Sequence, residues 1–266
     1  LGYLPLALEQ AGAYMATTNC KCHIYLKYFK ANSIKQLKKR AQSPTTRDKQ
    51  RLAVQTTWKM NFDHVKTESE ELSLGHIPCD ILNCLSYLSP DDIPVEVITQ
   101  ASEMLAVELS DITENEVLSI LSKFSLIQSL ERKLSVHRLV QEVMRNEHDN
   151  AEKRKYFEMS AEIIYCSLAK TNNPTSLIGA SHHKPESDQS LMLWSDLVSN
   201  ACSLVQNIRQ SLLEIHSPEL CYLLNQCAVF NSVNLENQKA LADQSDKLAI
   251  LAKQEHVSES IKGCML

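Results

Sequence analysis

The residues with the clearest potential for metal chemistry are Cys20, Cys22 and His23, which stand together near the start of the chain. Thiolate and imidazole groups bind zinc, but a structural zinc site needs two separated pairs of ligands. No second Cys/His pair lies at a suitable spacing nearby, so we expect no metal site. His182 and His183 fall in a polar linker, where solvated loop residues are the preferred interpretation.

The motifs of two common kinds of catalytic site are missing from the sequence. There is no Gly-x-Ser-x-Gly elbow for a nucleophilic serine. There is no Gly-x-x-x-x-Gly-Lys-Ser/Thr phosphate loop, and five scattered glycines cannot build one. No hydrophobic strand ends in an acid that would hold Mg²⁺. We therefore expect that this chain is not an enzyme, and that any nucleotide hydrolysis would need an upstream segment.

The composition indicates a mostly helical protein of about two domains. The 266 residues include only five Gly and eight Pro, and helix-favouring residues are plentiful. The net charge of −5 predicts no strong general attraction to nucleic acid or to anionic lipid. Nine Cys without regular spacing favour reduced thiols in a cytoplasmic protein. No apolar run approaches the ~20 residues that cross a bilayer.

The apolar pattern predicts a mostly α fold in four parts. Residues 1–45 are expected to form a short helical bundle, and 46–150 a winged-helix domain with one small β-hairpin. A helix and a linker follow over 151–190, and 191–266 are expected to form α-helical hairpins that resemble repeats. The first helix would start at Pro5, because proline is tolerated in the first helical turn. An apolar helix at this place suggests a piece of a larger protein, cut inside a domain.

Apolar residues recur at helical spacing in the first half of the chain. The residues expected to face inward are Ala7, Leu8, Ala11, Tyr14, Leu26, Phe29, Ile34, Leu37, Val54, Trp58 and Phe62. A further helix is expected from about Thr67. Apolar residues on both sides of the charged tip Glu131-Arg132-Lys133 predict a β-hairpin. An amphipathic helix follows at once, and helices that end in a hairpin suggest a winged helix.

The last part of the chain has the spacing of further helices. Trp194 and the apolar residues after it follow an i, i+3, i+4 pattern, and Trp194 is expected to anchor the core, as is Trp58. Ser217-Pro218-Glu219 combines the cap, the proline and the acid that are typical of a helix N-terminus.

Three stretches resemble, in the expected order, the NB-ARC branch of the STAND signalling ATPases. LGYLPLALEQAGAY is similar to the end of that family's nucleotide-binding module. AVQTTWKMNFDHV, followed by LNCLSYLSPDDIPVEVI, resembles the start of its winged helix, and LSILSKFSLIQSLERKLSVHRLVQEVMR resembles the wing and the next helix. The resemblance covers residues 1–148. Innate immunity is a common setting for the family.

The resemblance implies nucleotide contacts at two places. In the family, the loop before the first of these helices packs on the adenine ring, which suggests Leu4 and Pro5, with Gly2 allowing the turn. The family's winged helix carries a Met-His-Asp motif whose His reaches the β-phosphate of ADP. The matching residues here include His137, with Arg138 in place of the acid. An arginine can contact phosphate, but it does not repeat the acid's structural role. Without the resemblance, His137 is interpreted as a cap where a strand meets a helix.

The same branch often carries tetratricopeptide repeats downstream, and residues 217–253 resemble one degenerate repeat. The residues that fit are Cys227, Ala228, Phe230, Ala240 and Leu248, whereas Gln244 and Lys247 depart from the pattern. The resemblance therefore implies protein partners that bind through the C-terminal helices.

Together these features predict the regulatory and scaffold portion of a signalling protein that is switched by ADP and ATP. The nucleotide would bind only together with an upstream phosphate loop, and activation would allow homo-oligomer assembly, with no membrane partner. The alternative is a protein-interaction adaptor without a nucleotide switch. A weaker interpretation is a nucleic-acid binder that uses Lys35, Lys38, Lys39 and Arg40, although these residues precede the winged helix.

Overall fold

The structure is a computed structural model, and it describes residues 4–38, 46–105, 114–171, 188–211 and 217–233. Within these residues the fold is mostly α, with ten helices and one small β-hairpin, which confirms the predicted fold class. The chain divides into two compact units. Unit 1 comprises Leu1–Ser86 and Ser102–His148, and unit 2 comprises Tyr87–Ala101 and Asp149–Leu266.

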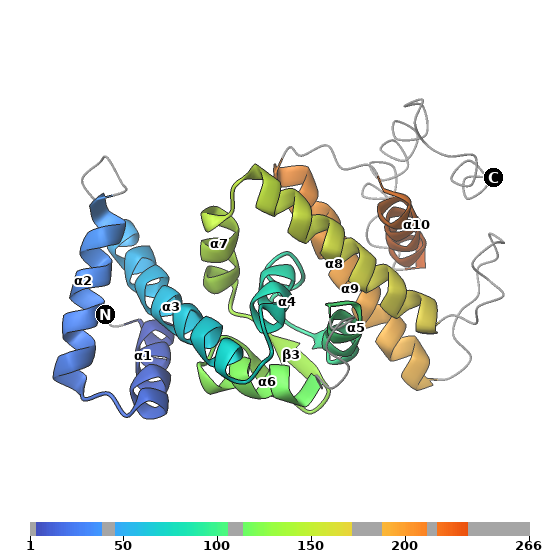
Figure 1. The fold of residues 1–266 in the computed structure, drawn as a ribbon. Coiled ribbons are helices and arrows are strands. Elements are labelled where there is room, and N and C mark those ends of the chain that lie inside the picture. The colour runs from blue at the N-terminus through green and yellow to red at the C-terminus, as the bar shows by residue number, and fades with distance from the viewer. Residues whose placement is uncertain (1–3, 39–45, 106–113, 172–187, 212–216, 234–266) are drawn as a thin grey trace. The chain divides into compact units, whose positions relative to one another are not determined.

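Unit 1 is organised around one long central helix (Figure 1). Its helices are α1 (Pro5–Thr18), α2 (Cys22–Lys38), α3 (Thr46–Glu71), α4 (Ile77–Leu85), α6 (Glu114–Lys123) and α7 (Arg138–Glu147). The central α3 packs against the other five. Because α3 has neighbours on several sides, residues around most of its circumference are buried from Leu52 to Asn61. Its apolar residues therefore do not form a single stripe.

The prediction of a separate helix from Thr67 was wrong, because α3 continues without a break to Glu71. The helix then ends in a tight turn, in which the Leu74 N–H donates to the Ser69 carbonyl at 2.8 Å. Ser73 and Gly75 have φ angles of 60° and 57° in this turn. The left-handed conformation at a helix end is what stops α3 here.

The predicted inward face of the first two helices is partly wrong. Ala7, Ala11 and Tyr14 are buried as expected, but Leu8 is 51% exposed and the polar Gln10 is fully buried. In α2, Tyr25 is buried, whereas Leu26 is 40% exposed. The side chains of Ile34 and Leu37 lie outside the described residues. The direction from which α3 approaches decides which face of each short helix is covered.

The predicted hairpin is confirmed by strands β2 (Gln128–Leu130) and β3 (Lys133–Ser135), which pair antiparallel with Leu130 opposite Lys133. Two residues, Glu131 and Arg132, therefore form the turn. Glu131 has a φ of 55°, and Arg132 is not among the described residues with positive φ. This pattern matches a type II′ turn, which suits the twist of a hairpin even though glycine is absent.

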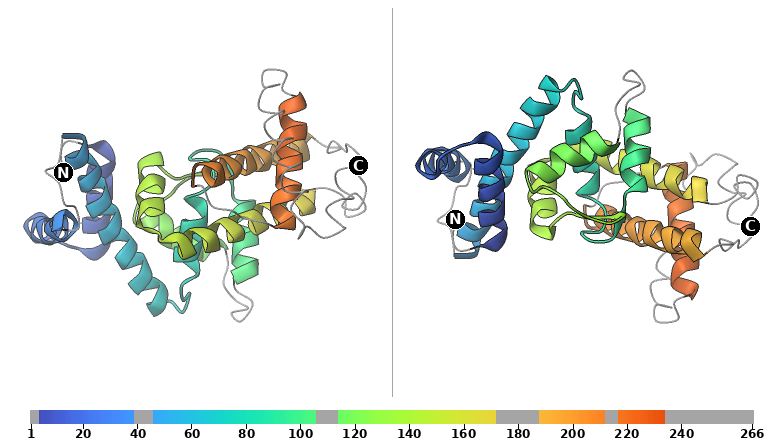
Figure 2. Two further views of the ribbon diagram at one scale, coloured as in Figure 1. Left: turned by 90° about the horizontal axis from the view of Figure 1, so that it is seen from above. Right: turned by 90° about the horizontal axis from the view of Figure 1, so that it is seen from below.

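Unit 2 contains three long helices together with a short earlier segment. The elements are β1 (Ile93–Pro94), the start of α5 (Glu96–Leu105), α8 (Asn150–Thr171), α9 (Asp188–Ser211) and α10 (Pro218–Val233). Each of the three helices packs against the other two, and Figure 2 shows α8 and α9 side by side with α10 across them. The Tyr87 ring lies 4.2 Å from the Phe157 ring, and the Tyr87 carbonyl accepts a hydrogen bond from Asn207 Nδ2 at 2.8 Å.

The helical patterns predicted for unit 2 are largely confirmed. On α9 the buried apolar residues are Leu197, Val198, Ala201, Leu204, Val205 and Ile208. The Leu220 N–H donates to Ser217 Oγ at 3.1 Å, so Ser217 caps α10 as predicted. Trp58 is buried, but Trp194 is only half-buried, and its Nε1–H donates to Gln226 Oε1 at 3.3 Å. The residues 234–253 of the predicted repeat lie outside the described residues.

Candidate functional site

The first predicted nucleotide contact lies at the start of α1. Leu4 is the N-cap residue, with φ −82° and ψ 122°, and no side-chain hydrogen bond caps this end. The Leu4 carbonyl accepts the Leu8 N–H at 3.0 Å, and Pro5 occupies the first turn, where no N–H is needed. Leu4 is half-buried and Pro5 is exposed. Gly2 lies outside the described residues.

A buried polar network fixes α1 in unit 1. Thr57 Oγ1 donates to Gln10 Oε1 at 2.7 Å, and Asn61 Nδ2 donates to the Gln10 carbonyl at 3.1 Å. Asn61 Nδ2 also donates to the carbonyl of Phe124, at the end of α6, at 2.8 Å. Gln10, Thr57 and Asn61 are fully buried. One amide group of α3 thus connects α1 with the start of the segment that leads to the hairpin.

The second predicted contact, His137, is the N-cap residue of α7. Its Nδ1 accepts a hydrogen bond from the Leu139 N–H at 3.2 Å, and its carbonyl accepts the N–H groups of Val140 and Gln141. Both His137 and Arg138 are exposed. The capping role that the residues alone suggested is therefore present, and it also sets the imidazole tautomer. Because Nδ1 accepts, a neutral ring carries its proton on Nε2 and can donate from there.

Helix α7, which begins after His137, is fixed by packing and by hydrogen bonds. Val136, Val140 and Met144 are buried, so the strand leading into α7 and the inner face of α7 are both packed. The buried Gln141 donates from Nε2 to the Leu85 carbonyl at 3.0 Å, and Arg145 bonds to the Ser86 carbonyl. These contacts fix α7 against the end of α4. His137 is therefore an exposed side chain on a rigid support.

The two predicted contact regions are connected through the hairpin. Gln128 Nε2 donates to Glu9 Oε1 at 3.3 Å, one turn after Pro5 on α1. Gln128 is also the strand partner of Ser135, which precedes His137 by two residues. The structure thus brings the elements that carry Pro5 and His137 to one part of unit 1.

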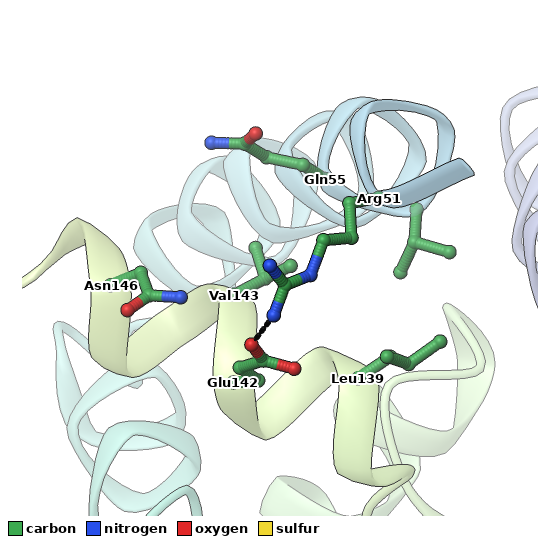
Figure 3. Close-up of a pocket in the computed structure, with 7 residues that line it drawn as sticks. Arg51, Gln55, Leu139, Glu142, Val143 and Asn146 are labelled. Atoms are coloured by element: carbon green, nitrogen blue, oxygen red, sulfur yellow. Dashed lines mark ion pairs between the residues drawn. The ribbon is translucent and has the colours of Figure 1, made fainter. Parts of the chain in front are cut away.

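A small pocket lies between α3 and α7 (Figure 3). It is lined by Arg51, Val54, Gln55, Leu139, Glu142, Val143 and Asn146, and its volume is about 50 Å³. Arg51 and Glu142 point toward one another across it and form an ion pair. Gln55 bonds to Glu147. This volume admits a few water molecules but no nucleotide.

The sequence analysis missed these links between helices. Neither Arg51 nor Glu142 was singled out from the sequence. Both are polar residues on helices that pack together, but no local spacing relates positions 51 and 142. For Asn61 and Gln10 a signal exists, since each is a polar residue within an apolar helical pattern.

Residues 70–153 match a domain of unknown function, DUF7779. The matched region begins at the end of α3 and includes the hairpin, His137 and the whole of α7. It does not include Leu4 or Pro5. Neither the curated proteins nor the solved structures contain a significant match to the chain.

The other sites considered from the sequence have no further support. Among the described residues, no group of three or more His, Cys, Asp or Glu side chains is arranged to hold a metal ion. Lys35 and Lys38 fall in α2, and Lys39 and Arg40 lie outside the described residues. No helix in the described part of the chain is long and apolar enough to cross a membrane.

Proposed function

We propose that this chain is the regulatory portion of a signalling protein that is switched by ADP and ATP. His137 binds a phosphate oxygen of ADP through its Nε2–H and so holds the resting form. Leu4 and Pro5 line the adenine side, and Arg138 adds a positive charge beside His137. The phosphate-binding loop comes from another segment of the protein, and this chain supplies no catalytic residue.

The observation that supports this proposal most directly is the bond from the Leu139 N–H to His137 Nδ1. Because of this bond, a neutral imidazole ring of His137 donates from Nε2. The side chain is exposed, and the helix α7 that follows it is packed on its inner face. The N-terminus of α7 also carries partial positive charge, which favours an anion at this position. A phosphate is therefore the ligand chemistry that suits His137 best.

A second line of support is the path from α1 to the hairpin. Adenine and β-phosphate lie at opposite ends of ADP, so a protein that closes on ADP needs two separate contact regions in a fixed relation. The network around Asn61 and the Glu9–Gln128 bond hold the elements of both regions in one unit.

The test is a fluorescence titration of the protein, expressed with its own upstream residues, with a fluorescent ADP analogue. His137→Ala removes the phosphate donor and the cap, whereas His137→Asp keeps a strong cap but places a carboxylate next to the phosphate. A hydrogen bond to a charged group contributes about 1.5–3 kcal/mol, so His137→Ala should raise Kd by about 10-fold to 100-fold. His137→Asp should weaken binding at least as much.

His76→Ala is the matched control, because His76 is an exposed N-cap histidine in the same unit, on α4. It should leave Kd unchanged. The proposal fails if the wild-type protein does not bind the ADP analogue, or if both His137 variants bind it within twofold of wild type.

The second candidate is a protein-interaction adaptor without a nucleotide switch. It is favoured by the packing of unit 2, where the α10 residues Leu220, Leu223, Leu224 and Cys227 are buried as a repeat-like stripe. A folded wild-type protein that fails to bind ADP in the same titration would favour this function.

A further inference from the structure

Helix α2 is attached to unit 1 along one side, where it packs on α1 and α3. Tyr25 is buried there, and Phe29 packs beside it with its ring stacked on that of Tyr25 at 6.3 Å. Ser33 Oγ lies 3.3 Å from Thr56 Oγ1 on α3. Tyr25, Phe29 and Ser33 follow one another at intervals of four residues, so they share one side of the helix.

The opposite side of α2 is exposed and carries apolar residues together with lysines. Ile24, Lys27, Tyr28 and Ala31 are exposed at the i, i+3, i+4, i+7 spacing of one helical face, and the exposed Lys30 lies next to Lys27 around the helix. Ile24 is 36% exposed and Tyr28 is 49% exposed. We call these five residues the outer face of α2.

The two lysines of the outer face have no negative partner. No Asp or Glu occurs anywhere in α2, from Cys22 to Lys38. Neither Lys27 nor Lys30 forms an ion pair with any residue that the structure describes. The whole chain has a net charge of −5, so this face is a local concentration of positive charge. A ligand that covers it must supply both negative charge and apolar surface.

Two classes of polyanion suit the outer face less well than a protein helix does. A membrane binds an amphipathic helix whose apolar face enters the lipid, but the side of α2 with Tyr25 and Phe29 is packed inside unit 1. A nucleic-acid backbone supplies phosphates for lysines but no aliphatic surface for Ile24. A helix with carboxylates beside aliphatic side chains provides both, because helix packing buries the apolar residues and leaves the charges at the rim.

We propose that the outer face of α2 binds an acidic amphipathic helix of a partner protein. Aliphatic side chains of the partner cover Ile24, Tyr28 and Ala31, and its carboxylates pair with Lys27 and Lys30. The charges speed association, and the apolar contact slows dissociation. The outer face contains none of the proposed ADP contacts, so this inference does not depend on nucleotide binding.

The test is a fluorescence anisotropy titration of the full chain against a labelled model peptide. The peptide has about 20 residues, with Leu at i, i+3, i+4 and i+7 and Glu at the other positions. A peptide of the same composition in scrambled order, without the helical period, is the control ligand. The wild-type chain should bind the helical peptide at least about 10-fold more tightly than the scrambled one, and added salt should weaken this binding.

Three variants test the assigned roles. Lys27→Glu/Lys30→Glu reverses both charges and should weaken peptide binding by at least about 10-fold. Tyr28→Ser removes apolar contact without changing charge and should weaken it by about 5-fold or more. Lys66→Glu/Lys153→Glu, on α3 and α8, changes the net charge by the same amount as the first variant. This control should bind within about twofold of wild type.

Several results would overturn the proposal. The wild-type chain may not fail to bind the helical peptide at about 1 mM, nor bind the scrambled peptide equally well. The control variant must not lose as much affinity as Lys27→Glu/Lys30→Glu. The partner class is wrong if these two lysines mediate binding to phosphatidylserine vesicles or to single-stranded DNA, or dimerisation of the chain, without binding the peptide. The comparison of the two peptides with the wild-type chain does not depend on whether a variant folds.

Discussion

At the scale of single residues, His137 uses one hydrogen bond to cap α7, and the same bond decides which ring nitrogen would serve the proposed ADP contact. The Nδ1 atom satisfies the Leu139 N–H, one of the N–H groups at a helix start that have no partner within the helix. The same bond leaves Nε2 as the donor of a neutral ring. The proposed function therefore couples stability with ADP binding at His137, and substitutions can separate the two.

We predict that His137→Ala lowers the free energy of unfolding of unit 1 by about 0.5–2 kcal/mol, because the cap of α7 is lost. His137→Asp should recover most of this loss, since an aspartate accepts from the same N–H groups and its charge suits a helix N-terminus. Urea unfolding followed through helical circular dichroism measures both. An unfolding midpoint in His137→Ala equal to that of wild type would show that the cap contributes nothing.

At the scale of elements, unit 1 is joined by buried amides as well as by apolar contacts. Asn61 on α3 donates to carbonyls at Gln10 on α1 and at Phe124 after α6. Asn61, Gln10 and Phe124 are all buried, so both hydrogen bonds are shielded from water. A single side chain therefore holds together three elements that the chain order separates.

We predict that Asn61→Ala destabilises unit 1 by about 2–4 kcal/mol, because it removes two buried hydrogen bonds and creates a small cavity. Asn32→Ala is the matched control, since among the described residues Asn32 Nδ2 bonds only within α2, to the Tyr28 carbonyl at 3.1 Å. It should change the unfolding free energy by less than about 0.5 kcal/mol. Equal effects of the two substitutions in chemical denaturation would contradict the importance of the network.

At the scale of the whole molecule, buried weak acids make the fold sensitive to alkaline pH. Burial raises the pKa of Cys79 from 9.0 to about 11 and raises the pKa of Tyr25, whose hydroxyl has no hydrogen-bond partner among the described residues. The pKa of Cys227 is raised in unit 2. These groups ionise more readily in the unfolded chain than in the folded protein.

We predict that the unfolding free energy falls as pH rises from about 9 to 11. The sign follows from the linkage between ionisation and folding. A group whose pKa is higher in the folded protein contributes its full stability at pH values below its unfolded-state pKa. That stability is lost as the pH rises to the folded-state pKa. For Cys79 alone the loss reaches about 2–3 kcal/mol. Denaturant titrations across this range should show a shallower fall for Cys79→Ala, whereas Cys22→Ala, at an exposed thiol, should keep the wild-type slope.

The features that were predicted correctly from the sequence are local ones. Pro5 starts α1 and Ser217 caps α10, because the conformational limits of proline and the hydrogen bonding of serine act within one helical turn. The hairpin followed from apolar residues on both sides of a short charged tip. The nucleotide contacts at Leu4, Pro5 and His137 came from a family resemblance and stay predictions.

The errors arose where neighbours distant in sequence decide the outcome. Leu8 and Leu26 satisfy a helical apolar pattern, yet Gln10 and Tyr25 are the buried residues, because the approach of α3 selects the covered face. The extra helix near Thr67 was inferred from a change in pattern, but a helix with neighbours on several sides has no single stripe to follow.

By itself, the sequence determined the helical class, the starts of α1 and α10, and the hairpin, and it contains no phosphate loop, because these features depend on residue types over a few neighbouring positions. The tertiary structure decided which polar groups meet: Asn61 with Gln10, and Arg51 with Glu142. Such pairs arise when helices pack at a fixed angle and register, and that geometry depends on every contact between them.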